Sequence, residues 1–129
     1  MIGKNGIALA VRPGTALMKR PEEYVTPSTD IFETRDAFVL RVDMPGASKE
    51  SIRIFIDKDL LTVRGTIGEL HREGAQMLVR EIVKTNYYRV FNLGQGVNKD
   101  GIEAEFADGV LSIHIPKTEQ TKTHEIRIQ

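Results

Sequence analysis

The chain has 129 residues, in which 18 basic side chains balance 18 acidic ones, and it contains no cysteine. This length fits one domain, and the balanced charge creates no net positive field that would favour nucleic acid or an anionic membrane. The missing thiols exclude disulfides, thiol catalysis and Cys-ligated zinc. The longest apolar run near the N-terminus, Ile7 to Val11, is too short for a signal-peptide core or a membrane span. We therefore expect a soluble, cytoplasmic protein.

Residues 1–27 are predicted to form a mostly irregular arm, because glycines and prolines interrupt any apolar periodicity. A short helical turn near Ala16 to Arg20 is the one regular element expected there. Apolar side chains on such an arm need cover, either from their own domain or from a partner chain. The arm carries six large ones: Ile2, Ile7, Leu9, Val11, Leu17 and Met18.

From Ser28 onward the apolar pattern takes a period of two, which is typical of strands with one buried face. Met44-Pro45-Gly46 ends the first strand, and Phe55 falls on the face opposite the isoleucines of the second. Short turns at residues 57–59 and 108–109 force antiparallel hairpins. This recurrence of short strands predicts a β-sandwich or barrel. The predicted strands cover residues 38–43, 52–57, 61–64, 77–83, 87–93, 102–106 and 111–115.

Three motifs go beyond this pattern. Residues 43–46 read D-M-P-G, residues 104–111 read A-E-F-A-D-G-V-L with Ile-Pro-Lys at 115–117, and the chain nears its end with Ile-Arg-Ile at 126–128. Together they resemble the D-x-P-G turn, the A-x-x-x-[ND]-G-V-L signature and the I-x-I tail of the small heat-shock (alpha-crystallin) family. The match covers about residues 28–129 in the right order.

The resemblance implies an all-β fold, an immunoglobulin-like antiparallel β-sandwich called the alpha-crystallin domain, over residues 28–117. Residues 1–27 would then be a short irregular N-terminal arm, and residues 118–129 an extended C-terminal tail. Two features depart from the family pattern. The arm is short, and Gly94 stands where a proline usually ends the preceding strand.

The resemblance also implies that Ile126 and Ile128 dock into a groove between two strands at open sheet edges of a neighbouring chain. Burial of each isoleucine would contribute about 1.5–3 kcal/mol before ordering costs. The alternative is an ordinary terminal strand that pairs within its own sheet. The expected groove residues are Ile52, Ile54, Ile56, Ile102, Ala104 and Phe106.

A further implication is a dimer formed by exchange of residues 77–83, which would add to the neighbour's sheet. The alternative is a plain hairpin with residues 86–93 of the same chain. Arg89 shares a strand face with Tyr87 and Phe91, matches an arginine of the family's dimer-forming strand, and is expected to pair with an acidic residue across the interface. The expected interface residues are Met77, Leu78, Val79, Arg80, Ile82 and Arg89.

We expect neither a catalytic site, nor a cofactor, nor a metal. The three histidines, His71, His114 and His124, show no metal-binding spacing, and the chain has neither a phosphate-binding loop nor a nucleophile elbow. The function predicted is ATP-independent holding of partly unfolded proteins, with the apolar arm as client contact, in a self-assembled homo-oligomer that binds neither nucleic acid nor membrane. The alternatives are a CS-type co-chaperone that binds a larger chaperone and a purely structural self-assembling protein.

Overall fold

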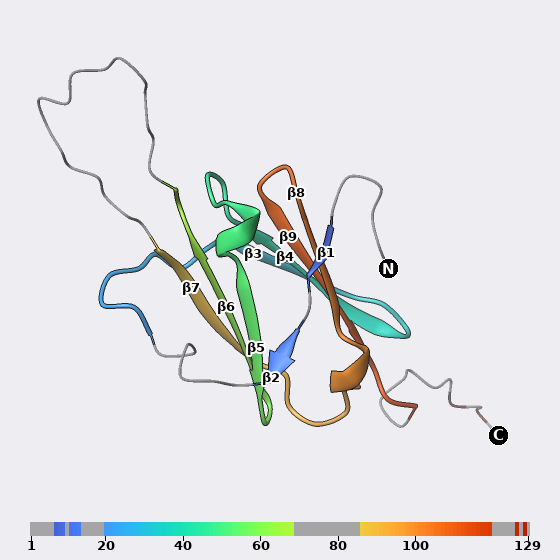
Figure 1. The fold of residues 1–129 in the computed structure, drawn as a ribbon. Helices are drawn as coiled ribbons and strands as arrows, with labels where there is room; N and C mark the ends of the chain where they lie inside the picture. Colours follow the sequence, from blue (N-terminus) through green and yellow to red (C-terminus); the bar gives the residue numbers. More distant parts are fainter. Residues whose placement is uncertain are drawn as a thin grey trace, which may run out of the picture.

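The computed structural model describes residues 7–9, 11–13, 20–68 and 86–119, together with Ile126 and Ile128. Short strands dominate it, with two single-turn 3-10 helices, η2 (Lys49–Ser51) and η3 (Lys99–Gly101) (Figure 1). The strands are β1 (Ile7–Leu9), β2 (Arg12–Pro13), β3 (Thr29–Glu33), β4 (Ala37–Asp43), β5 (Arg53–Asp57), β6 (Leu60–Thr66), β7 (Asn86–Asn92), β8 (Glu103–Ala107) and β9 (Val110–Pro116).

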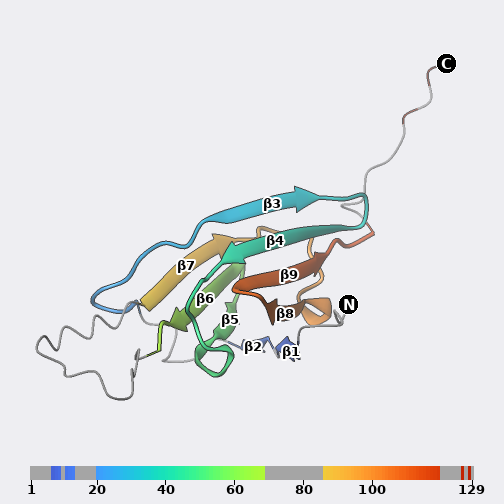
Figure 2. The ribbon, with the colours of Figure 1, turned by 90° about the horizontal axis from the view of Figure 1, so that it is seen from above.

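The strands form two sheets that pack as a sandwich (Figure 2). One sheet has the order β1-β8-β9-β4-β3 and the other β2-β5-β6-β7. Neighbouring strands are antiparallel, except that β2 runs parallel to β5. The predicted antiparallel β-sandwich is confirmed, and so are the predicted strands within the described residues. The exchanged segment at residues 77–83 lies outside them.

The hairpin turns follow from local backbone chemistry. Asp108 and Gly109 both have positive φ, 52° and 76°, between β8 and β9. This conformation suits the right-handed twist of the flanking strands, and Asp-Gly adopts it at little cost. The short turn expected at residues 108–109, with its antiparallel hairpin, is therefore confirmed. Gly46 has φ 81° in the turn that ends β4, as the Pro45-Gly46 pair predicts.

Alternate side chains of the central strands fill the space between the sheets. Leu111, Ile113 and Ile115 of β9 are buried, and they meet Leu61 and Val63 of β6 in one apolar cluster. Tyr87 joins this cluster, where its hydroxyl donates a hydrogen bond to the Pro45 carbonyl at 2.7 Å and burial raises the pKa of Tyr87 above its ordinary value of 10.0.

Strict alternation fails on β5. Phe55 was expected on the solvent face, yet it is fully buried, and so is its register partner Thr62 on β6. The outer face of the four-stranded sheet is therefore covered at this position. β2 pairs with β5 at the same place, in the register Arg12 to Phe55, so β5 is not the open edge that was expected.

One buried cation ties the end of β9 to the β3–β4 hairpin. The side chain of Lys117 is 1% exposed, and its Nζ lies 2.7 Å from Oε2 of Glu33, which is 61% exposed. The same Nζ lies 4.8 Å from the centroid of the Phe38 ring. The backbone N–H of Lys117 also donates to the carbonyl of Asp36 at 2.8 Å.

We expect Glu33→Gln to destabilise the fold more than Lys117→Met does. Glu33→Gln leaves a buried ammonium without its counter-charge, which should cost about 1–2 kcal/mol, whereas Lys117→Met replaces the cation with an apolar chain of similar length and should cost under about 1 kcal/mol. Urea denaturation midpoints of the two variants provide the measurement. A larger loss in Lys117→Met would contradict this account of the pair.

Candidate functional site

The edges of β5 and β8 carry the first candidate site, and the N-terminal arm already pairs with both. β1 runs antiparallel to β8, with Ile7, Ala8 and Leu9 opposite Phe106, Glu105 and Ala104. β2 pairs with β5, with Arg12 and Pro13 opposite Phe55 and Ile56. The expectation that both edges are open is wrong for this chain, because the extended backbone of residues 7–9 and 12–13 pairs with them.

The arm shows that β5 and β8 lie on the same side of the sandwich, as Figure 2 also shows. β1 ends at Leu9 and β2 begins at Arg12, so their Cα atoms are at most about 11 Å apart. Val11 lies between the two strands, is half-buried and packs against the apolar core. The arm therefore crosses from one sheet to the other. We call this place the β5–β8 side.

The six residues expected to line a groove do come together here. Ile52, Ile54, Ile102 and Ala104 are buried members of the core, whereas Ile56 and Phe106 are half-buried and pack against it. The first four therefore form the floor of the site. Only Ile56 and Phe106 keep substantial surface for an incoming side chain.

Among the described residues, the two tail isoleucines have no such cover. Ile126 is 87% exposed and Ile128 98% exposed, and neither belongs to a strand. The alternative of a terminal strand within the same sheet is therefore not what the structure shows. Of the arm residues expected to contact clients, Val11 packs on the core and Ile7 and Leu9 pair through their backbones with β8. Ile2, Leu17 and Met18 lie outside the described residues.

Arg89 occupies the face of β7 that the alternation predicted. Its Nη1 donates to the Pro27 carbonyl at 3.1 Å, and its guanidinium carbon lies 5.0 Å from the centroid of the Phe91 ring. The side chain thus fixes the segment that leads into β3. The expected acidic partner on another chain stays a prediction, and the other expected interface residues, Met77, Leu78, Val79, Arg80 and Ile82, lie outside the described residues.

The opposite side of the sandwich carries a second apolar surface, which the sequence patterns missed. Among the described strands β3 is the outer one there and pairs only with β4, and its Ile31 and Phe32 are 59% and 47% exposed. The paired apolar residues Ile31-Phe32 just before the turn at residues 34–36 were the available signal. An apolar cavity of about 240 Å³ opens beside β3. Its lining residues are Ile31, Phe38, Leu40, Phe91, Asn92, Leu93, Val97 and Ile115.

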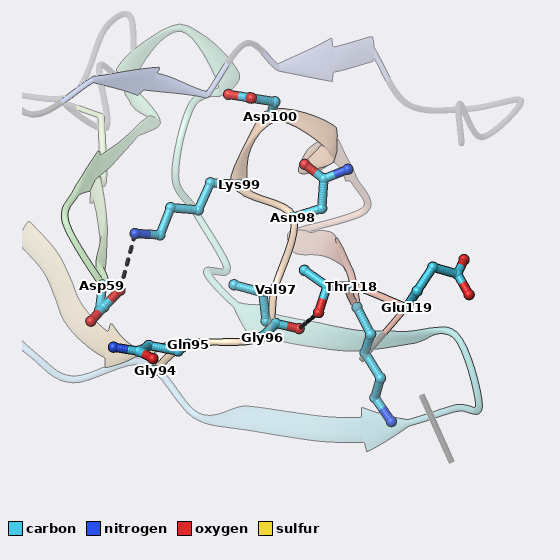
Figure 3. Close-up of a pocket in the computed structure, with 11 residues that line it drawn as sticks. Asp59, Gly94, Gln95, Gly96, Val97, Asn98, Lys99, Asp100, Thr118 and Glu119 are labelled. Atoms are coloured by element: carbon cyan, nitrogen blue, oxygen red, sulfur yellow. Dashed lines mark hydrogen bonds and ion pairs between the residues drawn. The ribbon is translucent and has the colours of Figure 1, made fainter. Parts of the chain in front are cut away.

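A larger, polar pocket of about 750 Å³ lies among the loops at residues 94–100 and 117–119 (Figure 3). Two contacts join its lining residues: Nζ of Lys99 lies 3.0 Å from Oδ1 of Asp59, and the Thr118 hydroxyl donates to the Gly96 carbonyl at 3.3 Å. Its lining includes no histidine. Across the described part of the chain, no three His, Asp or Glu side chains are grouped so that they could hold a metal ion. We assign no catalytic chemistry to this pocket.

None of the helices among the described residues is long and apolar enough to span a membrane.

Comparison with known proteins agrees with this geometry. A family model described as "Hsp20/alpha crystallin family" matches residues 30–129. The chain is 37% identical over 109 residues to small heat shock protein C2 of Rickettsia felis, an alignment that covers 84% of this chain and 71% of that relative. It is 32% identical over 105 residues to small heat shock protein C4 of the same organism, covering 81% of this chain and 64% of that relative.

Solved structures give the same result. A small heat-shock protein of Xylella fastidiosa superposes with a TM-score of 0.60 at 32% identity, covering 83% of this chain and 98% of that one. Heat shock protein 16.0 of Schizosaccharomyces pombe superposes with a TM-score of 0.63 at 29% identity, covering 81% of this chain and 99% of that one. Similarity therefore extends over the sandwich and part of the flanking segments.

Proposed function

Because the chain belongs to the Hsp20/alpha crystallin family of small heat shock proteins, we propose that it is an ATP-independent holding chaperone that assembles with copies of itself. The observation that carries this proposal is apolar surface presented on a stable sandwich. Ile126 and Ile128 are almost fully exposed on the tail, and Ile31 and Phe32 are exposed on an outer strand. Surfaces of this kind mark protein–protein contacts.

Assembly through the tail follows from the same exposure. Burial of two isoleucines would contribute about 1.5–3 kcal/mol each, and their spacing of two places them on one side of an extended segment. The half-buried Ile56 and Phe106 of a neighbouring chain would offer them apolar surface. The related Xylella fastidiosa protein has a distinct high order structure, which is consistent with higher assembly in this family.

Dimer formation is assigned to the β3 side. An outer strand presents unpaired N–H and C=O groups that can receive a further strand. Residues 77–83 of a second chain would pair along β3, and an apolar side chain of that segment would enter the cavity beside Ile31. Ile31 and Phe32 would be buried by that contact.

We expect Arg89→Ala to weaken this dimer. Arg89 fixes Pro27, two residues before β3, by a hydrogen bond from a charged group, and such bonds contribute about 1.5–3 kcal/mol. The dimer dissociation constant should rise about tenfold or more, and the variant should aggregate more readily. Native mass against concentration is the measurement, made in a chain that also carries Ile126→Ser and Ile128→Ser, where the dimer is the expected unit.

The matched control is Arg53→Ala. Arg53 also donates to backbone carbonyls, those of Glu50 and Ile52, but it lies on β5, away from the β3 side. We expect this variant to keep the dimer dissociation constant. Equal dissociation constants for Arg89→Ala and the parent chain would refute the role given to Arg89.

Client holding is tested by light scattering from a thermally aggregating client protein. The full chain, added at equal subunit concentration without nucleotide, should suppress most of the scattering, because partly unfolded clients expose apolar segments and strand edges. An unrelated protein of similar size at equal mass is the control. Undiminished scattering over a tenfold excess of chain would reject the chaperone proposal, and a protein that forms large assemblies without suppression would be purely structural.

A further inference from the structure

We propose that arm residues 7–13 act as an intramolecular competitor of the tail for the β5–β8 side. This inference rests on the proposed docking of Ile126 and Ile128 at that side. It adds that the two segments exclude each other, so that a tail can dock only where the arm has been released. The site would therefore have two alternating occupants, one from its own chain and one from a neighbour.

Backbone pairing is the first reason for exclusion. β1 takes the outer edge of β8 along residues 104–106, and β2 takes the outer edge of β5 along residues 55–56. A strand edge has a single set of outward N–H and C=O groups, so a second extended segment cannot pair with the same residues. A tail that docks beside Ile56 and Phe106 needs the positions that the arm holds.

The arm also resembles the tail in its pattern. Residues 7–11 read I-A-L-A-V and residues 126–128 read I-R-I, so both place large apolar residues at every second position. An extended segment with this spacing presents its apolar residues on one side. Val11, the last of the arm series, already packs against the core cluster that contains the buried floor residues of the site.

The pairing of the arm with β5 and β8 is short enough to open and close reversibly. β1 pairs through three residues and β2 through two, and such short edge strands open at little free-energy cost. The arm belongs to the same chain as the site, so its effective concentration there is high. The effective concentration of a neighbour's tail rises when chains gather in an assembly. The two occupancies can therefore be near balance. Tail docking would release arm residues such as Ile7 and Leu9, and so would couple assembly to the exposure of apolar client-binding segments.

A reversible disulfide tests this in the full chain, which has no cysteine of its own. Ala8 and Glu105 are direct register partners, and paired Cα atoms about 4.5–5.5 Å apart fall within disulfide range. Ala8→Cys with Glu105→Cys should therefore form an intrachain bond on oxidation. The matched control is Ala8→Cys with Glu103→Cys, because Glu103 lies two residues along β8, about 7 Å from the paired position, which puts it beyond disulfide range.

Binding of a labelled peptide with the sequence of residues 124–129 is the readout. It is measured in chains that also carry Ile126→Ser and Ile128→Ser, so that their own tails do not compete. Oxidation of the register pair should weaken peptide binding at least about tenfold, and reduction should restore it. The off-register pair should show no change. As a second variant, Val11→Asp should release the arm and strengthen peptide binding, because it puts a charge against the apolar core.

Three results would overturn the proposal. A failure to cross-link, or a cross-link between two chains, would show that the arm does not occupy its own β5–β8 side. An intrachain cross-link with unchanged peptide affinity would show that arm and tail do not compete, and tail docking itself would stand. A peptide that binds neither the reduced chain nor Val11→Asp would remove tail docking, and with it this inference.

Discussion

Replacement of both Ile126 and Ile128 with serine should lower the native mass of the full chain several-fold, to that of a dimer. Each tail loses two isoleucine side chains, whose burial would contribute about 1.5–3 kcal/mol of binding free energy each. Every tail-linked interface in the assembly is weakened by that amount. The β3 side, which we assign to the dimer, is untouched by these changes. Light scattering after size separation gives the mass directly, at a concentration where the parent chain forms its largest species.

Arg127→Ser is the matched control for this prediction. It alters the same tripeptide, but alternation places residue 127 on the side opposite the two isoleucines. We expect it to keep the mass of the parent assembly. A double variant as large as the parent would contradict tail-linked assembly, and a parent chain that is monomeric at all concentrations would favour an adaptor of the CS type.

Ile113→Ala should produce the largest loss of stability among the substitutions considered. Ile113 is fully buried on β9, where it pairs in register with Leu40 on one side and Ala104 on the other. Removal of its outer carbons leaves a cavity in the core, which should cost about 2–5 kcal/mol. That is a large part of the roughly 5–15 kcal/mol that stabilises a typical domain. Denaturant unfolding of the dimeric, tail-substituted chain provides the measurement.

Leu60→Ala is the control for Ile113→Ala. Leu60 is also an aliphatic strand residue, but it begins β6 and is 45% exposed, so its truncation should cost under about 1 kcal/mol. The central position of Ile113 also has a functional consequence, because β9 supports β8 and with it the β5–β8 side. Similar unfolding midpoints for the two variants would contradict the core described above.

Local patterns predicted most of the sandwich because they record which face of each strand is buried. Leu111, Ile113 and Ile115 alternate with polar or half-buried residues, and Asp108-Gly109 encodes the turn that precedes them. β3 escaped prediction because four of its five residues are exposed. An outer strand with little buried surface has no clear apolar period.

The candidate site was predicted less completely because it is formed by backbone pairing between strands that lie far apart in the sequence. The six floor and rim residues could be chosen from strand alternation and resemblance, and they do come together. No pattern in residues 1–27 showed that β1 and β2 would pair with β8 and β5, since Ile7 to Val11 is apolar enough for many partners. Residues 77–83 lie outside the described chain, so exchange stays a prediction.

Holding of a client is tested most directly by the mass and composition of what remains soluble after heating. The full chain and an aggregating client, heated together without nucleotide and then separated by size, should yield a soluble complex that contains both proteins and exceeds the mass of the unheated assembly. Added ATP should not release the client. A client found only in the pellet, with the chain alone in solution at its original mass, would contradict the account.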